Sequence, residues 1–394
     1  MKLFRQIGAV TAMNFRSLPQ RATTSAVIVI GIAGVVAVLV SVLAMSTGLI
    51  RTMENSGRED RAIVMRNGSL AEASSALDRD SARLVKDAAG IKRDAQGEPI
   101  LSAETMRIHM LHKKEDDAEV NVILRGVGPK VTEVRPELQI IEGRMFAPAV
   151  TEVIVGKAAN AQFKGLNVGD TISSRGATWT VVGIFATGGD SHESTLLTDA
   201  ETLISVDHRG AFQSVTALLE SPAAFQSFKD SLLANPALAV EVQREREYYR
   251  KQSETMSTII SVIAYVVGGI MAVGAVFAAL NTMYSAVSAR LQEIATLRAL
   301  GFGSTAMVMS VLAEALLLAL IGGVIGALIA WSFFNGNTVS TSGGGMGQLV
   351  FELSVDPQLM VLGIVWACVI GLIGGLFPAV RAARLPVATA LRAV

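Results

Sequence analysis

The sequence predicts a membrane protein of four transmembrane α-helices with a large α+β domain inserted between helices 1 and 2. Hydrophobic residues make up 51% of the 394 residues, and they concentrate in four blocks that are almost free of charge. Each block exceeds the roughly 18–20 apolar residues that cross a ~30 Å hydrocarbon core. The blocks are 23–50, 255–289, 299–335 and 357–380. The residues between the first two blocks are polar and numerous enough to bury a core of their own.

Residues 51–240 alternate strand-like and helix-like runs, which is typical of an α+β domain. Turn signals rich in glycine separate the runs. The expected strands are 61–66, 120–127, 151–156, 170–174 and 178–185. The expected helices are 76–89, 157–164, 199–204 and 222–234.

Residues 241–285 are expected to form one continuous helix, a stalk that becomes the second span. Its first part, 241–254, is polar all round and contains no Gly or Pro. Such a helix needs support from a neighbour, and an outward extension of the first span is the obvious partner because 28 apolar residues outreach the bilayer core.

The third span, 304–335, and the fourth, 357–380, each carry a face of small residues, at 321–330 and 370–375. Faces of this kind let membrane helices approach closely. The loop between these spans, 336–356, contains a Ser/Gly-rich run and is expected to be a flexible connector.

The distribution of charge sets the orientation. Residues 51–254 hold 25 of the 34 Lys+Arg and 30 of the 34 Asp+Glu, so they are net acidic and the rest of the chain is net basic. Basic residues without balancing acids occur in the N-terminal segment 1–22 and the tail 381–394, and two more arginines occur at 286–303. The positive-inside rule places these three segments in the cytoplasm, and the large domain and the 336–356 loop outside it. The first segment also reads as a short amphipathic helix on the inner membrane face.

A cleaved signal peptide is the alternative to a first span. A signal's apolar region has about 7–15 residues, and this one has 28, so we expect a retained anchor. The single cysteine, Cys368, lies in the last span, so the external domain has no disulfide, and this composition fits any compartment.

The segment 286–303 is charged and amphipathic. Five apolar residues fall on one helical stripe, and Gly301 follows the last of them, as a helix C-terminus prefers. The stripe consists of Val287, Leu291, Ile294, Leu297 and Leu300. The simplest interpretation is a helix lying on lipid headgroups.

The motif around this helix indicates more. NTM-x-x-AV-x-x-R-x-x-EIATLRALG, residues 281–301, resembles the signature of the FtsX/MacB-type permeases of ABC transporters. In that family this is the coupling helix, which docks into a groove on the cytoplasmic ATPase. The resemblance implies that the apolar stripe fills the groove and that three charged residues set the register by charge pairing. The docking residues are then Arg290, Glu293, Ile294, Arg298 and Gly301, with Arg381 and Arg384 nearby on the tail.

Further motifs extend the resemblance from about residue 110 to 392. They include Glu314 with the glycine-rich run after it, the closing FPAVRAARLPVATALR (377–392), and several runs similar to the family's periplasmic core domain. The external domain is therefore expected to be periplasmic and the chain to lie in the cell inner membrane. Residues 51–110 match least well.

The chain contains no G-x-x-x-x-G-K-[ST] phosphate-binding loop, since VGKAAN (155–160) lacks both the upstream Gly and the Ser/Thr. We therefore expect ATP and Mg²⁺ to bind two copies of a separate ATPase subunit, as in permeases resembling DevC or LolC/LolE, and no catalysis in this chain. The four histidines, His109, His112, His192 and His208, are expected to be exposed rather than metal ligands.

Glu314 is the only acid in the spans, and a carboxylate there is costly and often functional. We expect it to pair with a polar group such as Asn281 or with a cytoplasmic arginine. Proton coupling is the alternative, but no second intramembrane acid is present to form a relay.

The resemblance implies a permease subunit that couples ATP hydrolysis to periplasmic movement. It would pair with a second copy or a paralogue within membrane lipid, and it would export substrates with a periplasmic adaptor of the membrane-fusion type. Lipoprotein release and FtsX-like signalling to cell-wall hydrolases stay open. An ATP-independent transporter or receptor would need ion ligands or inverted repeats in the membrane, which are not evident. Nothing predicts a nucleic-acid partner.

Overall fold

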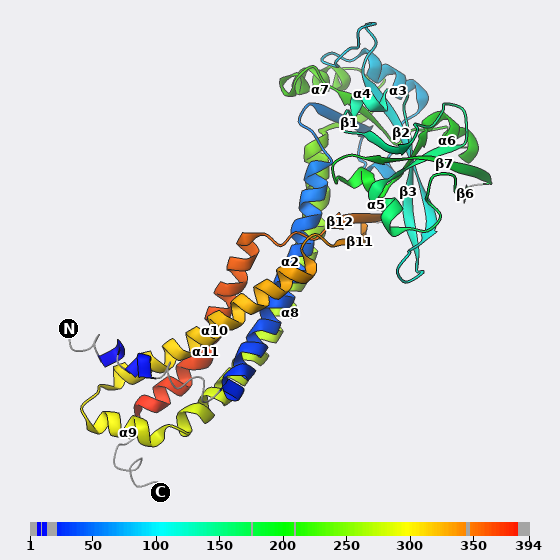
Figure 1. Ribbon diagram of the computed structural model, residues 1–394. Coiled ribbons are helices and arrows are strands. Elements are labelled where there is room, and N and C mark those ends of the chain that lie inside the picture. Colours follow the sequence, from blue (N-terminus) through cyan, green and yellow to red (C-terminus); the bar gives the residue numbers. More distant parts are fainter. Residues whose placement is uncertain are drawn as a thin grey trace. The chain divides into compact units, whose positions relative to one another are not determined.

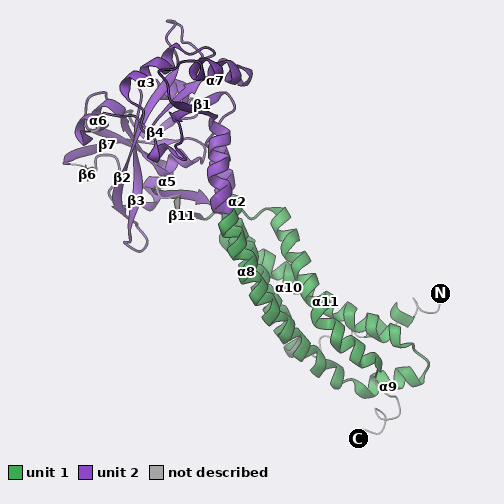
Figure 2. Ribbon diagram, turned by 180° about the vertical axis from the view of Figure 1, so that it is seen from behind, with its two compact units in different colours: residues 1–47, 258–337, 353–394 green, residues 48–257, 338–352 purple. Residues whose placement is uncertain are grey.

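The computed structural model describes residues 6–8, 10–13, 22–174, 176–208, 210–343 and 347–384. These residues divide into two compact units (Figure 2). The membrane unit comprises 1–47, 258–337 and 353–394, and the external unit comprises 48–257 and 338–352. Most of the expected N-terminal amphipathic segment lies outside the described residues, although 6–8 and 10–13 are helical, and the closing motif beyond Arg384 also lies outside them.

Four helices of the described chain are long and apolar enough to cross a membrane. They are α2 (Ala22–Asn55), α8 (Glu245–Ser288), α10 (Ser304–Phe334) and α11 (Pro357–Arg384). The last residues of α2, 48–55, and the first residues of α8, 245–257, belong to the external unit. A short helix, α9 (Leu291–Ala299), lies between α8 and α10.

The small-residue faces are the places where the spans meet most closely. A Cβ on Gly326 would lie 2.4 Å from the carbonyl oxygen of Ala33 in α2. A Cβ on Gly371 would lie 2.4 Å from Cβ of Ala319, which joins α11 to α10. Larger side chains would separate these backbones, so the expectation of close packing at 321–330 and 370–375 is confirmed.

The external unit is built on a ten-stranded mixed sheet (Figure 1). The strand order is β10-β1-β9-β2-β3-β8-β5-β7-β4, with β6 paired to β7. The strands are β1 (Arg61–Arg66), β2 (Leu101–His112), β3 (Glu119–Val127), β4 (Gln139–Gly143), β5 (Glu152–Gly156), β6 (Thr171–Ser174), β7 (Ala177–Ala186), β8 (Leu196–Asp199), β9 (Ser214–Leu218) and β10 (Val240–Arg244).

Short helices cover this sheet. They are α3 (Arg79–Leu84), α4 (Val131–Val134), α5 (Lys157–Gln162), α6 (Ala200–Asp207) and α7 (Phe225–Leu233). Four 3₁₀ turns complete the unit: η2 (Glu72–Ser74), η3 (Val85–Asp87), η4 (Ser191–Ser194) and η5 (Pro222–Ala224). One apolar core lies under α3, α6 and α7, and a second lies between α5 and the strands β3, β5, β7 and β8.

All five strands expected in the external domain are present, as are helices in the four expected stretches. The sequence did not indicate β2, although β2 is the longest strand of the sheet. The reason is that β2 buries Glu104 and Arg107 among its apolar residues. Buried charges break the apolar alternation by which a strand is recognised.

The expected connector 336–356 is instead a β-hairpin, β11 (Thr338–Gly343) and β12 (Gly347–Glu352). The two strands pair antiparallel, with Val339 opposite Phe351. The side chain of Ser194 holds β12 to η4, because its Oγ accepts the Val350 N–H at 2.9 Å. The expectation of a connector without secondary structure was therefore wrong for 338–343 and 347–352, where β-branched and aromatic residues of β12 are buried in the external unit, while the Ser/Gly-rich run continues into 344–346, outside the described residues.

The stalk helix begins at Glu245 rather than at 241. Residues 240–244 form the edge strand β10, which pairs antiparallel with β1. The run VEVQR alternates apolar and polar residues, and Val240 and Val242 are both buried. Its period of two marks a strand, which the polar composition of 241–254 concealed.

Candidate functional site

The short helix α9 has a well-defined end. Gly301 follows it with φ +94°, and its N–H donates to the carbonyl of Arg298 at 3.0 Å. The N–H of Phe302 donates to the carbonyl of Leu297 at 3.1 Å. This pair of bonds is the Schellman arrangement, in which a left-handed residue, usually glycine, closes the last turn. Gly301 therefore has a structural role.

The apolar stripe of α9 faces inward. Val287 and Ile294 are buried, and Leu297 packs beside them. Their cluster includes Val10 of the N-terminal helical segment, Met307 and Val311 of α10, and Ala379 and Ala382 of α11. These three residues of the stripe thus pack against the chain's own helices, whereas its last member, Leu300, is exposed.

Arg290 and Glu314 form a buried ion pair beside this cluster. Arg290 Nη1 lies 3.0 Å from Glu314 Oε2, and Nη2 lies 3.4 Å from Oε1. Only 6% of Arg290 and 5% of Glu314 are exposed. Arg290 immediately precedes α9 and Glu314 lies in α10, so this two-point contact fixes the start of α9 against the third span.

The opposite side of α9 is open. Glu293 and Thr296 are exposed, and Leu300 is 72% exposed at the C-terminal end of the helix. On α11, Arg381 is exposed with its guanidinium 5.4 Å from the ring centroid of Tyr284, and Arg384 is exposed as well. This outer surface, comprising Glu293, Thr296 and Leu300 with Arg381 and Arg384 on the same unit, has the mixed polar and apolar character that protein interfaces use.

A second group of buried charges lies where α8 begins. Glu245, the first residue of α8, has a fully buried side chain. Its carboxylate lies 2.5 Å from Arg61 Nε of β1 and 2.6 Å from Arg135 Nη1, which follows α4, and it accepts the N–H of Arg58 at 3.2 Å. The helix N-terminus also favours an acid at this position.

The charges continue through the sheet. Glu104 of β2 binds both Arg135 and Arg125 of β3, and Arg125 in turn binds both oxygens of Glu72 at 3.1 and 2.9 Å. Glu137 binds Arg61 at the other end. The alternating series Glu137–Arg61–Glu245–Arg135–Glu104–Arg125–Glu72, called the charge chain below, ties α8 to β1, β2, β3, α4 and η2.

Glu72 and Arg135 of the charge chain are held in their charged forms. Burial alone would raise the pKa of Glu72, but the attraction of Arg125, with hydrogen bonds from Arg125 and Ser214, holds it below the usual range. Burial alone would lower the pKa of Arg135, but the attraction of Glu245 and Glu104 raises it above its usual value. Each buried charge is therefore compensated by its neighbours.

Two of the four histidines differ from the expected exposure, because His192 is buried and His109 is half-buried. His192 is buried, with Nδ1 3.1 Å from Asp190 and Nε2 3.3 Å from the Tyr249 hydroxyl, because η4 packs against the first turns of α8. His112 and His208 are exposed. His109 and His112 are three residues apart on β2, so they point to opposite faces of the strand and cannot share a ligand.

Comparison with known proteins gives the family. Residues 22–234 match the family model of the MacB-like periplasmic core domain, and residues 256–387 match that of the FtsX-like permease C-terminal domain. The chain belongs to the MacB/FtsX-like family of ABC transporter permeases.

Three individual proteins illustrate the similarity. A macrolide export ATP-binding/permease protein MacB of Bdellovibrio bacteriovorus is 23% identical over 96% of this permease and 61% of that protein. One from Acinetobacter baylyi is 31% identical over 37% of this chain and 20% of its own length. The periplasmic region of MacB from Actinobacillus actinomycetemcomitans superposes with a TM-score of 0.38 at 14% identity, covering 52% of this chain and 96% of that structure. The chain thus spans 20 and 61% of the two curated relatives.

The docking residues that the permease motif implied differ in their exposure. Glu293, Arg381 and Arg384 are exposed, whereas Arg290 and Ile294 are buried within the chain. The partner of Glu314 is Arg290, while Asn281, the other expected partner, is exposed. The charge chain was not predicted, because its members lie in β1, β2, β3, η2, α8 and the connection between α4 and β4, which are distant in sequence.

We predict that Arg290 and Glu314 stabilise α9 as a pair. Glu314→Ala or Arg290→Ala should each lower the free energy of opening of α9 by about 3 kcal/mol, because each leaves a buried charge unpaired. The double variant should lower this free energy by at least about 1 kcal/mol less than the sum of the two single effects. Hydrogen exchange of the α9 amides in the purified chain measures this, with Glu293→Ala as the exposed control. Additive effects would contradict the pairing.

We also predict that Glu245→Gln loosens the attachment of α8. The substitution leaves Arg61 and Arg135 facing a neutral amide, and the free energy of opening of β1 and β10 should fall by about 3–5 kcal/mol. Glu247→Gln, which breaks the exposed Glu247–Lys251 pair two residues later, should cost less than about 1 kcal/mol. Equal protection of β1 in the two variants would refute a structural role for the charge chain.

Proposed function

We propose that this permease binds a separate cytoplasmic ATPase subunit through the outer surface of α9. Binding and hydrolysis of ATP and Mg²⁺ on that subunit would move α9, and α8 and α10 would pass the movement to the external unit. The observation that carries the proposal is the two-sided character of α9. Its inner side is fixed by the Arg290–Glu314 pair and an apolar cluster, while Glu293, Thr296 and Leu300 face outward.

The division of roles within α9 differs from the arrangement that the family motif implied. Leu300, rather than the buried Ile294, is the apolar residue free to enter a groove on a partner. Glu293 and the arginines Arg381 and Arg384 supply charges of both signs for register and specificity. Arg290 acts by holding α9 in place, since Glu314 already occupies its guanidinium.

The orientation follows from the basic residues near the ends of the spans. With α9 and both terminal segments in the cytoplasm, the external unit lies in the periplasm and the four helices cross the inner membrane. A second permease copy or a paralogue would complete the transmembrane part, and two ATPase subunits would bind below it.

Export with a periplasmic adaptor is the transport activity we propose. The support is the likeness to proteins named for macrolide export, which extends over 96% of this chain in the Bdellovibrio relative. Four spans per subunit leave little room for a wide tunnel, so the work of the cycle would be movement of the external unit rather than passage through the bilayer.

We predict that Leu300→Asp weakens ATPase binding. Placing a charge at the exposed end of α9 should cost about 2 kcal/mol of binding free energy, roughly thirtyfold in affinity, without disturbing the fold. The measurement is the ATPase affinity and ATP turnover of the reconstituted complex, compared with Leu70→Asp. Leu70 is 97% exposed in the external unit and should tolerate the same change.

The Ile294→Asp variant should fail in a different way from Leu300→Asp. Because Ile294 is only 8% exposed, its carboxylate would be buried in the apolar cluster, and we expect loss of α9 structure before any specific loss of binding. If Leu300→Asp keeps wild-type affinity and turnover, the outer surface of α9 is not the ATPase site.

A further inference from the structure

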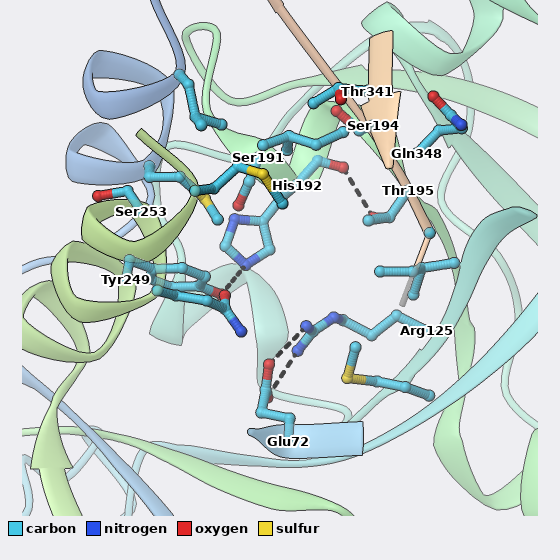
Figure 3. Close-up of a pocket in the computed structure, with 18 of the residues that line it drawn as sticks. Glu72, Arg125, Ser191, His192, Ser194, Thr195, Tyr249, Ser253, Thr341 and Gln348 are labelled. Carbon is cyan, nitrogen blue, oxygen red and sulfur yellow. Dashed lines mark hydrogen bonds and ion pairs between the residues drawn. The ribbon is translucent and has the colours of Figure 1, made fainter. Parts of the chain in front are cut away.

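A cavity of about 90 Å³ lies inside the external unit (Figure 3). The end of α2, the first turns of α8, the strands β2 and β3, the turn η4 and the β11–β12 hairpin all contribute to its wall. The lining residues are separated by up to 300 residues in sequence. The proposed ATPase binding at α9 does not involve this cavity.

The wall is largely apolar. Three methionines and three branched aliphatic residues line it: Leu49, Met53, Met106, Ile123, Met256 and Leu349. Methionine side chains are flexible and polarisable and adapt to apolar ligands of different shape. A ligand with an apolar body therefore fits this space.

The charged groups at the wall are already paired. Arg125 binds Glu72 and Glu104, and His192 lies between Asp190 and Tyr249. Figure 3 shows the contacts of Arg125 with Glu72 and of His192 with Tyr249. A charged ligand would find no unpaired opposite charge among these groups and would lose its hydration on entering. The ligand is therefore uncharged.

Tyr248 supplies a hydrogen-bond donor. Its hydroxyl oxygen accepts the Glu72 N–H at 3.1 Å and the Gln252 side-chain amide at 3.3 Å. With the Gln252 amide in this orientation neither contact accepts the hydroxyl's own proton, although only 4% of Tyr248 is exposed. Burial raises the pKa of Tyr248 well above neutrality, so the proton is retained. A ligand oxygen in the cavity would satisfy this donor.

The cavity also lies where the spans reach their first charges. On α2 the uncharged run ends at Arg51, two residues before Met53. On α8 the uncharged run begins after Glu254, two residues before Met256. The uncharged stretches of α2 and α8 therefore continue to within two residues of Met53 and Met256 at the cavity wall, and an apolar molecule leaving the outer leaflet can follow them to the cavity.

We propose that this cavity binds the end of an uncharged, largely apolar molecule that carries a carbonyl oxygen and is drawn from the outer leaflet. The Tyr248 hydroxyl donates to the carbonyl, and the methionines surround the apolar part. An apolar cavity of ~150 Å³ holds a benzene ring, so this one takes a segment of about four non-hydrogen atoms. The proposal does not depend on the ATPase partner.

The test uses 2-octanone and n-octane as matched probes, since they differ in the carbonyl. The full chain, labelled with ¹³C at the methionine methyls and held in lipid nanodiscs, is titrated with each. We expect 2-octanone to shift the resonances of Met53, Met106 and Met256 but not those of Met65 and Met145, which lie elsewhere in the unit. Met65 and Met145 also report whether each variant is folded.

Two tyrosine variants locate the donor. Tyr248→Phe should weaken 2-octanone binding about fivefold, as expected for one lost hydrogen bond, and leave octane binding unchanged. Tyr249→Phe is the matched control, because its hydroxyl is occupied by His192, and it should leave both affinities unchanged. The proposal is overturned if the three methionines do not respond, if octane binds as tightly as 2-octanone, or if Tyr248→Phe binds 2-octanone like the wild type.

Discussion

The carboxylate of Glu245 is the contact on which the attachment of α8 depends. It is the first residue of a 44-residue helix and receives two guanidinium groups and a backbone N–H in a site closed to water. Through Arg135, Glu104 and Arg125 the same charges reach β2, β3 and η2. Separating α8 from the sheet would leave several of these buried charges without their partners. A movement of α8 at this end must therefore move the sheet as well.

The other end of α8 has a similar arrangement. The helix ends at Ser288, and two residues later Arg290 binds Glu314 of α10 in a buried, two-point ion pair. Thus each end of α8 is held by an arginine–carboxylate contact to the unit in which it lies. At 1.5 Å per residue the helix is about 66 Å long, and it is continuous from Glu245 to Ser288.

The sequence predicted the features that depend on local pattern. Four long apolar runs gave the four helices, five β-rich runs gave five strands, and the glycines at 322–326 and 371–375 gave the closest helix contacts. It failed where a residue's environment is set by distant partners. Arg61 and Glu245 are 184 positions apart, so nothing near either of them indicates that both are buried. The hairpin was missed for the same reason, since its partner η4 lies about 150 residues earlier.

Only a contact with a defined geometry can fix which side of α9 faces inward. A helix held only by apolar contacts can turn or slide at little cost, because the hydrophobic effect has no preferred direction. The bidentate Arg290–Glu314 pair has one geometry, and any shift of α9 by a residue would leave two charges buried without partners. Force applied to Leu300 on the outer side is then transferred to α10 rather than lost in local rotation. Arg290, which the family motif indicates as a docking charge, is therefore the internal contact that fixes the position of α9 in this structure.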